Sequence, residues 1–237
     1  MLRPFLASLA AVAMALSAGG ARAQVLFQST FDSTTEGWTG VATAGAGSPI
    51  VSVPVSFMSS AGGGSLFHSG PLADGRTSFY LAPSGLVSAL HSAIGGSVSF
   101  DVGSTPAHGD VFYATFPDIL IRAGSNEIRM HIFSVAPSPS FDHVNLSFTT
   151  ASPWIFFDGT TRSTATQANI DGVLAGAALM VIRAEYWASA NADSALLDNV
   201  LIAGPIPEPE TYAMLLAGLA LLGFAARRRK PKEDAAA

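Results

Sequence analysis

The chain has 237 residues, a formal net charge of −5 and no cysteine, which excludes disulfides, thiolate metal sites and cysteine nucleophiles. Between Gln24 and Ile206 it contains five arginines, no lysine and thirteen acidic residues. A region this acidic repels phosphate backbones, so nucleic-acid binding is not expected.

The amino-terminal segment has the pattern of a secretion signal. Met1-Leu2-Arg3 gives a short positive start, an apolar run covers residues 5–16, and Ala21-Arg22-Ala23 follows. Small residues at the first and third of these last positions fit signal peptidase, whereas the alternative is a buried amino-terminal helix. We therefore predict a signal peptide over residues 1–23, cut by signal peptidase to leave Gln24 as the mature amino terminus.

Residues 24–204 are predicted to form one β-rich domain. Apolar and polar residues alternate with the period of two that half-buried strands show, as at Val98, Phe100 and Val102. The expected strands cover residues 25–31, 50–57, 78–81, 97–102, 118–122, 128–132, 144–148, 179–186 and 196–202. Residues 61–65 and 136–140 are expected to be turns, and only residues 168–177 are expected to be helical. Many short strands between turns predict an all-β jelly-roll β-sandwich.

The landmarks along this domain resemble those of the laminin B domain, also called laminin domain IV, in its bacterial form. They include Glu36-Gly37-Trp38, Tyr80-Leu81-Ala82-Pro83, Ile182-Arg183-Ala184-Glu185-Tyr186 and Leu197-Asp198-Asn199-Val200. The resemblance implies a galactose-binding-like jelly roll used for adhesion or structure. Laminin copies lie among cysteine-rich EGF-like modules that this chain lacks, so the partners of laminins do not transfer.

The carboxyl-terminal segment has three ordered parts: Pro207-Glu208-Pro209, an apolar run over residues 213–226, and a cluster of Arg227, Arg228 and Arg229. Basic residues after an apolar helix stay on the cytoplasmic side, which places the domain outside. Fourteen residues span only about 21 Å at about 1.5 Å each, so the expected transmembrane helix is short.

This pattern, assigned to residues 205–232, resembles the PEP-CTERM sorting signal of Gram-negative bacteria. The resemblance implies transient insertion in the inner membrane, an exosortase as partner, and cleavage near the Pro-Glu-Pro segment. The protein would then remain at the cell surface or in the extracellular space. A plain tail anchor is the alternative.

No catalytic motif is present in the sequence, and the five histidines are scattered, as expected of surface or strand polar residues. Arg183 and Glu185 lie two apart on an expected strand and therefore on one face. We interpret them as charges that pair within the sheet or across to a neighbouring segment, in a framework motif of the laminin B resemblance, rather than as a catalytic acid and its partner.

Two candidate ligand sites remain. Trp187 follows an expected strand among small polar residues and is a candidate for stacking on a sugar ring. The jelly roll that the laminin B resemblance implies often holds one structural calcium where the first and last strands meet. Asp32 and Glu36 lie near the first expected strand and Asp198 lies in the last, so on this resemblance their carboxylates are a candidate structural calcium site; the alternative is that they are polar residues of strand ends and turns.

Together these patterns predict a non-enzymatic, surface-sorted protein that is adhesive or structural in the extracellular polysaccharide matrix. One alternative is a carbohydrate-binding module with a defined glycan ligand. The other is an extracellular polysaccharide hydrolase.

Overall fold

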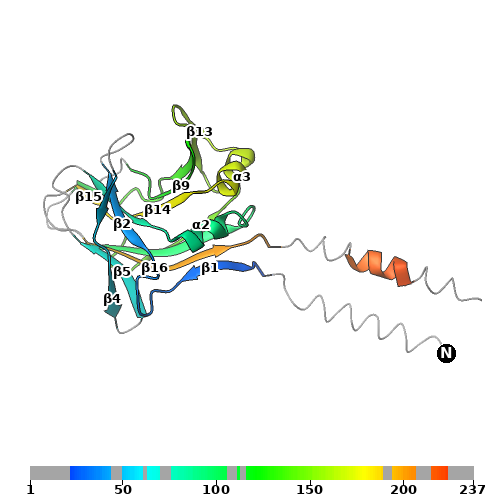
Figure 1. Cartoon of the computed structure of the whole chain (residues 1–237), viewed down its shortest axis with the longest axis horizontal. Helices are drawn as coiled ribbons and strands as arrows, with labels where there is room; N and C mark the ends of the chain where they lie inside the picture. Colours follow the sequence, from blue (N-terminus) through cyan, green and yellow to red (C-terminus); the bar gives the residue numbers. More distant parts are fainter. Residues whose placement is uncertain are drawn as a thin grey trace, which may run out of the picture. The chain divides into compact units, whose positions relative to one another are not determined.

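The computed structural model describes residues 22–43, 50–60, 63–69, 76–105, 111–112, 116–188, 194–206 and 215–223. Contacts divide the chain into two units, of which the larger, Gln24–Pro205, contains the sheets and the hydrophobic core (Figure 1). In the other unit, Met1–Ala23 with Ile206–Ala237, a helix covers residues 215–223. Within the described ranges, no helix has the length and apolar character needed to cross a membrane.

One sheet of the larger unit has the strand order β11-β7-β16-β5-β4, and β1 pairs with β16 as well. Its strands are β1 (Val25–Ser29), β4 (Ser56–Ser60), β5 (Gly63–Ser69), β7 (Ser97–Thr105), β11 (Asp142–Ser147) and β16 (Ser194–Ala203). In β16, Leu197 and Val200 are both buried although they are three residues apart, because the register shifts between Asp198 and Leu201. Asn199 has φ 50°, which is the left-handed conformation that asparagine tolerates at such bulges.

The second sheet has the order β13-β12-β10-β9-β14-β6-β2-β3. These strands are β13 (Arg162–Thr164), β12 (Ile155–Phe157), β10 (Asn126–Met130), β9 (Ile119–Ala123), β14 (Leu179–Arg183), β6 (Thr77–Leu81), β2 (Thr39–Thr43) and β3 (Val51–Val53). A short pair, β8 (Val111–Phe112) and β15 (Trp187–Ala188), stands apart from both sheets.

The two main sheets form a β-sandwich around a shared core. Val98 and Phe100 from the six-stranded sheet and Ile121 and Ile182 from the eight-stranded sheet belong to one buried apolar cluster. Burying apolar side chains from two facing sheets is the main stabilising term of such a fold. The predicted β-sandwich is therefore confirmed at the level of fold class.

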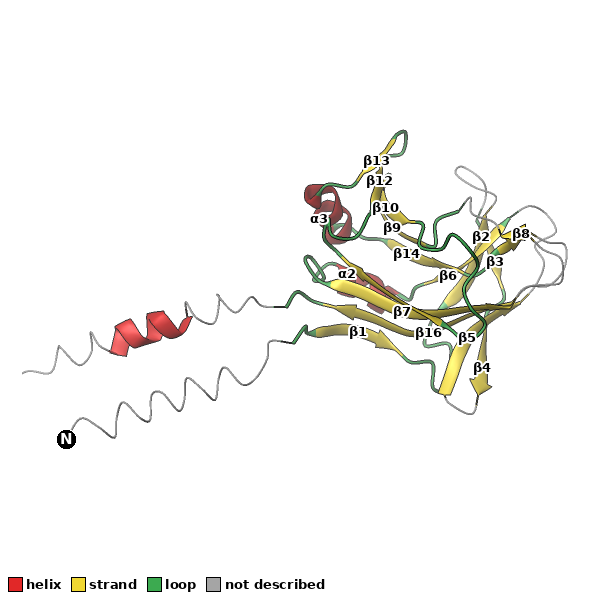
Figure 2. Cartoon of the chain, turned by 180° about the vertical axis from the view of Figure 1, so that it is seen from behind, coloured by secondary structure: helices red, strands yellow, loops and turns green. Residues whose placement is uncertain are grey.

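The structure describes two helices within the larger unit (Figure 2), and both place side chains in this core. Helix α3 (Gln167–Ala175) begins at a capping box, in which the Thr166 hydroxyl accepts from the Asn169 N–H and the Asn169 side chain accepts from the Thr166 N–H. The other helix, α2 (Ser84–Leu90), follows Pro83 and buries two leucines. It was not expected from the sequence, since only the region of α3 was predicted as helical.

Two expectations for the first half of the domain were wrong. The strand expected at residues 50–57 is divided into β3 and β4 around Pro54, which has no N–H to donate to a ladder. Residues 61–65 were expected to be a turn, but β5 begins at Gly63. A Cβ at Gly64 would lie 1.8 Å from the Phe31 carbonyl oxygen, so glycine is needed here for a close backbone approach within a strand.

The eight-stranded sheet is apolar on part of its second face as well. Phe79, Leu120 and Val181 form a second buried cluster there, and the Phe116 ring contacts Phe79 edge-on with centroids 6.1 Å apart. We call this side, opposite the main core, the outer face. Burial on both sides explains why β9 and β14 are nearly continuous apolar runs in the sequence.

Candidate functional site

An arginine cluster, made of Arg122, Arg129 and Arg162 with Glu127 and Phe157, lies on the outer face at the β13 end of the sheet. Its members are direct cross-strand neighbours, because Arg162 faces Phe157, Phe157 faces Glu127, and Glu127 faces Arg122. Arg129 follows Glu127 by two residues on β10, so both side chains leave the same face of the strand. Four neighbouring strands thus bring these side chains together.

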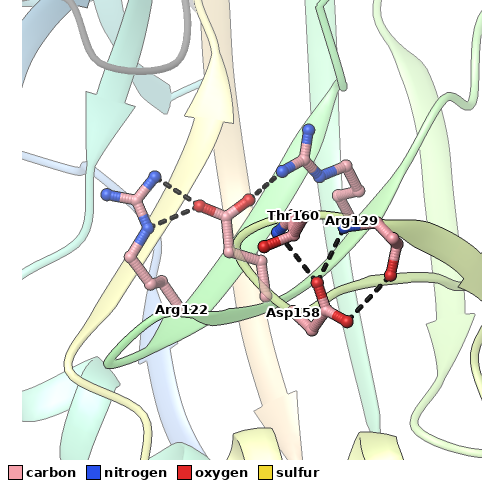
Figure 3. Close-up of polar contacts among 6 residues, drawn as sticks. Arg122, Arg129, Asp158 and Thr160 are labelled. Carbon is pink, nitrogen blue, oxygen red and sulfur yellow. Dashed lines mark hydrogen bonds and ion pairs between the residues drawn. The ribbon is translucent and has the colours of Figure 1, made fainter.

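Glu127 is shared between two guanidinium groups (Figure 3). Its Oε1 accepts a hydrogen bond of 2.6 Å from Nε of Arg122, and its Oε2 is paired with Nη2 of Arg129. The Arg129 guanidinium also lies 4.7 Å from the centroid of the Phe157 ring, and that of Arg162 lies 6.0 Å from it. Cation–π contact and the shared carboxylate therefore hold the three cations in one group.

The cluster is short of negative charge. Burial lowers the pKa of Arg129, Glu127 acts in the opposite direction, and the nearby charges of Arg162 and Arg122 lower it further. The Nε of Arg129 is buried without a hydrogen-bond partner among the described residues. Guanidinium donors therefore exceed the acceptors that the described part of the protein places around them.

Asp158, in the turn between β12 and β13, is the carboxylate that directly follows Phe157 of the cluster (Figure 3). It accepts hydrogen bonds from the main-chain N–H groups of Thr160 and Thr161 and from the Thr161 hydroxyl. These bonds, led by those from Thr161, lower the pKa of Asp158. The Asp158 oxygens accept hydrogen bonds within the turn itself, so Asp158 does not balance the charge of the arginine cluster as Glu127 does.

Arg183 belongs to a separate, deeply buried network. Its side chain is 1% exposed and its Nη1 lies 3.5 Å from Oδ1 of Asp118, which is 2% exposed. The other oxygen of Asp118 accepts from the N–H groups of Ile132 and Phe133, and the Arg183 guanidinium lies 5.0 Å from the Tyr186 ring centroid. Each charge is thereby compensated, which burial requires.

Glu185 is joined to Arg183 and to the neighbouring strand β6 by hydrogen bonds. Its Oε2 accepts from the N–H of Ser78 at 3.0 Å, while its carbonyl oxygen accepts from Nε of Arg183 at 2.5 Å. Both residues thus join neighbouring segments at the end of β14. These contacts agree with a structural role for both residues, and Asp118 is a further carboxylate partner of the Arg183 guanidinium, which the sequence did not indicate.

The residues proposed for calcium lie close enough to influence one another. Asp198 faces Asp101 across β16 and β7. Burial raises the pKa of Asp198 to about 6, and the charges of Asp101, Asp32 and Glu36 raise it too, against a lowering hydrogen bond from the Asn199 N–H. Negative charge is therefore concentrated beside the bulge of β16.

Some of these oxygens already have partners. Glu36 Oε1 accepts from the Phe31 N–H at 2.7 Å, and Asp32 Oδ2 accepts from the Thr30 hydroxyl at 2.7 Å. Among the residues that the structure describes, no three acidic or histidine side chains are arranged to hold a metal. The calcium site stays a prediction.

Three other sequence-based expectations had different outcomes. From the sequence, Trp38 and Trp154 are expected to be core or strand-edge aromatics, and both are core residues, 2% and 1% exposed. His68 was expected to be a surface or strand polar residue, and it lies in β5, where it is 3% exposed with Nδ1 2.9 Å from the Pro54 carbonyl oxygen. Trp187 lies in β15 opposite Phe112, and its side chain is outside the described residues, so its sugar-stacking role stays a prediction.

The sorting residues Pro207, Glu208, Pro209, Arg227, Arg228 and Arg229 also lie outside the described residues. Nevertheless, residues 205–230 match the family model of the PEP-CTERM protein-sorting motif. The chain therefore carries this motif, which indicates an exported, surface-sorted protein and exosortase as the enzyme that recognises it.

The fold of the larger unit is similar to that of a solved laminin domain. The L4b domain of human laminin alpha-2 superposes with a TM-score of 0.53 and 13% identity over 77% of this chain and 99% of that one. A family 11 carbohydrate-binding module from Clostridium thermocellum, in complex with a β-1,3-1,4-mixed-linked tetrasaccharide, gives a TM-score of 0.40 and 13% identity, over 76% and 95%. No match was found among curated protein sequences. The expected likeness to a laminin domain is confirmed as a likeness of fold.

Sequence reasoning did not find the arginine cluster. Glu127 and Arg129 lie two apart in the sequence, which would have been the available signal, but the strand was expected to begin at residue 128 and so did not include Glu127. The pairing of β10 with β9 and β12, which adds Arg122 and Phe157, depends on register between segments that the sequence pattern does not relate.

Proposed function

We propose that this protein is a non-enzymatic component of the extracellular polysaccharide matrix, with an adhesive or structural role. The observation that carries the proposal is the sorting motif at residues 205–230 directly after a laminin-like β-sandwich. A motif for surface sorting delivers the domain to the place where matrix polymers are assembled. The proposed course is removal of residues 1–23 by signal peptidase, transient insertion of the tail in the inner membrane, and cleavage by an exosortase.

Sorting is tested by changing the central residue of Pro207-Glu208-Pro209 in a host that has an exosortase. Glu208→Ala should leave the uncut protein in the inner membrane, because the recognised segment is altered. Glu210→Ala removes an equal charge two residues further on and serves as the matched control. Normal maturation of Glu208→Ala, measured by fractionation and intact mass, would show that the motif does not direct sorting.

The matrix role is tested by isolating the polysaccharide matrix of that host and measuring how much mature protein it retains. A matrix protein should stay with the polysaccharide through washing in buffer of low ionic strength. Recovery of the wild-type protein entirely in the soluble medium would refute the proposed role, even if export and cleavage proceed normally.

A carbohydrate-binding module with a defined ligand is the second candidate. The arginine cluster on the outer face favours it, because guanidinium groups without enough carboxylates form a binding surface for an anion. In this candidate function the protein is sorted to the surface in the same way, and its domain binds one specific glycan.

A further inference from the structure

We propose that the arginine cluster binds a carboxylate-bearing polysaccharide, a polyuronate, chiefly through Arg122 and Arg162. This inference rests on the proposed matrix function, since it names the class of ligand that would retain the domain there. Arg129 and Phe157 hold the contacting groups in position from within the cluster.

The positive charge of the domain is concentrated on this face. The arginines of residues 24–206 are Arg76, Arg122, Arg129, Arg162 and Arg183, and four of the five leave the outer face of the eight-stranded sheet. Arg183 is neutralised by Asp118 in the buried network. The remaining three form a local cationic surface on a domain in which acidic residues are in large excess.

The exposed fraction of each side chain indicates which residues of the cluster can contact a ligand and which hold the others in position. The side chain of Arg122 is 40% exposed and Arg162 is exposed, whereas Glu127 is 5% exposed and Arg129 is largely buried. The two outer cations are thus available to a ligand while the inner pair fixes Arg122. An arginine already oriented by its neighbours loses less side-chain entropy on binding.

A carboxylate of the protein itself shows which chemical group the arginines of the cluster can bind. The carboxylate of Glu127 lies between Arg122 and Arg129 and contacts both, so the spacing of these guanidinium groups suits a carboxylate (Figure 3). Planar guanidinium groups bind carboxylates with paired hydrogen bonds, which favours a uronate over a neutral sugar. Arg162 has its own donors available to a second carboxylate.

The separation of the contacts favours a polymer over a small anion. Arg122 lies on β9 and Arg162 on β13, with β10 and β12 between them. Three strand spacings of about 4.8 Å place their backbones about 14 Å apart. A chain with repeated carboxylates can contact Arg122 through one repeat and Arg162 through another, which adds a second charge-assisted contact to the first.

Binding is measured with the domain Gln24–Pro205, which contains every described strand and core residue, on immobilised polygalacturonate at low ionic strength. The double variant Arg122→Gln, Arg162→Gln should weaken binding by about tenfold or more, since two charge-assisted contacts are lost. Arg76→Gln removes one positive charge outside the cluster and should stay within about twofold of the wild type. Raising the salt concentration should weaken wild-type binding, because exposed charges are screened.

Thermal melting of each variant checks that the fold is retained, and Arg162→Gln alone provides a second variant, on the exposed edge strand β13. Equal binding by the wild type and both arginine variants would overturn the proposal. No binding of the wild type to polygalacturonate would overturn it as well, as would stronger binding to neutral dextran or to dextran sulfate.

Matrix retention distinguishes this inference from the function on which it rests. If the wild type is retained and the double variant is lost from the matrix, both are supported. If wild type and double variant are retained equally, the polyuronate site is refuted while the matrix role stands. Loss of the wild type itself refutes the matrix role and, with it, this ligand assignment.

Discussion

The main-chain N–H of Gly204 donates a hydrogen bond of 2.8 Å to the carbonyl oxygen of Gln24. This bond continues the antiparallel pairing of β1 with β16, in which Val25 faces Ala203. The first and last residues of the domain therefore lie side by side. Both proposed cleavage positions, before Gln24 and near Pro207-Glu208-Pro209, are within a few residues of this pair of strands.

Cleavage at Ala23 should leave β1 intact. Since pairing with β16 begins at Val25, a mature protein that starts at Gln24 keeps every residue of the described pair. We expect intact-mass and amino-terminal analysis of exported protein to give Gln24 as the first residue. Exported protein that still carried Met1, or that had lost Phe27, would contradict this cleavage position.

Replacing two glycines, Gly96 and Gly172, by alanine should change the free energy of unfolding in opposite directions. A Cβ at Gly96 would lie 2.0 Å from the Ala203 carbonyl oxygen, whereas a Cβ at Gly172 in α3 would have no neighbour within 4 Å. Gly96→Ala should lower the free energy of unfolding by about 1–3 kcal/mol, and Gly172→Ala should raise it by about 0.5–1 kcal/mol. Urea denaturation measures both, and an unaffected Gly96→Ala would mean that the end of β16 moves readily.

Strands with clear alternation were well predicted from sequence, because one face of each is buried and the other is not. β11 and β16 are examples, with Val144 and Leu146 buried between exposed polar neighbours. The short strands β12 and β13 were missed, since three residues give too little alternation to recognise. α2 was missed because Ser84–Leu90 has only two buried residues and no side-chain cap.

The candidate sites were harder to predict than the strands, because they depend on contacts between residues far apart in the sequence. That Asp32, Glu36 and Asp198 influence one another was inferred from a family resemblance, and the raised pKa of Asp198 agrees with their proximity. The partner of Arg183 was not inferable, because Asp118 lies 65 positions away and reaches it only through the pairing of β14 with β9. Register between strands, rather than local pattern, determines such contacts.

The buried pair of Asp118 and Arg183 should be sensitive to loss of either partner. Asp118→Ala leaves the Arg183 cation in the interior and removes the acceptor of two main-chain N–H groups, so we expect a loss of about 3–5 kcal/mol in the free energy of unfolding. Asp158→Ala removes an equal charge from an exposed turn and should have a clearly smaller effect. Similar losses for the two variants would show that the buried pair is not specially stabilising.

Acid should destabilise the domain through His68. Burial lowers the pKa of His68 from 6.5, with the hydrogen bond to Pro54 acting in the opposite direction. The unfolded chain therefore takes up this proton at higher pH than the folded one, so stability from this group is present above about pH 6.5 and falls as the pH falls below it. His68→Gln should flatten the change in melting temperature between about pH 6.5 and 5, and an unchanged profile would exclude this origin.

Asp198 should act in the opposite direction in metal-free protein. Its folded pKa of about 6 exceeds the usual value of 3.8, so the folded state keeps the proton to higher pH than the unfolded chain. Stability from this group is therefore greatest below about pH 4 and declines as the pH rises through about 6. Asp198→Asn should melt higher than the wild type at pH 7 without metal and should match it at pH 4.

If the predicted calcium site exists, the wild type should melt higher than Asp198→Asn at pH 7 once calcium is present. A cation beside Asp32, Glu36 and Asp198 favours the charged carboxylates and binds only the folded state, which adds about 2.7 kcal/mol at a hundredfold excess over Kd. For a domain of this size that corresponds to a rise in melting temperature of about 2–4 °C per kcal/mol. The wild type stripped with EGTA should melt higher after calcium is restored, whereas Asp198→Asn should respond little. If calcium leaves the wild-type melting temperature unchanged, or raises that of Asp198→Asn equally, the acidic residues beside the β16 bulge do not form a calcium site.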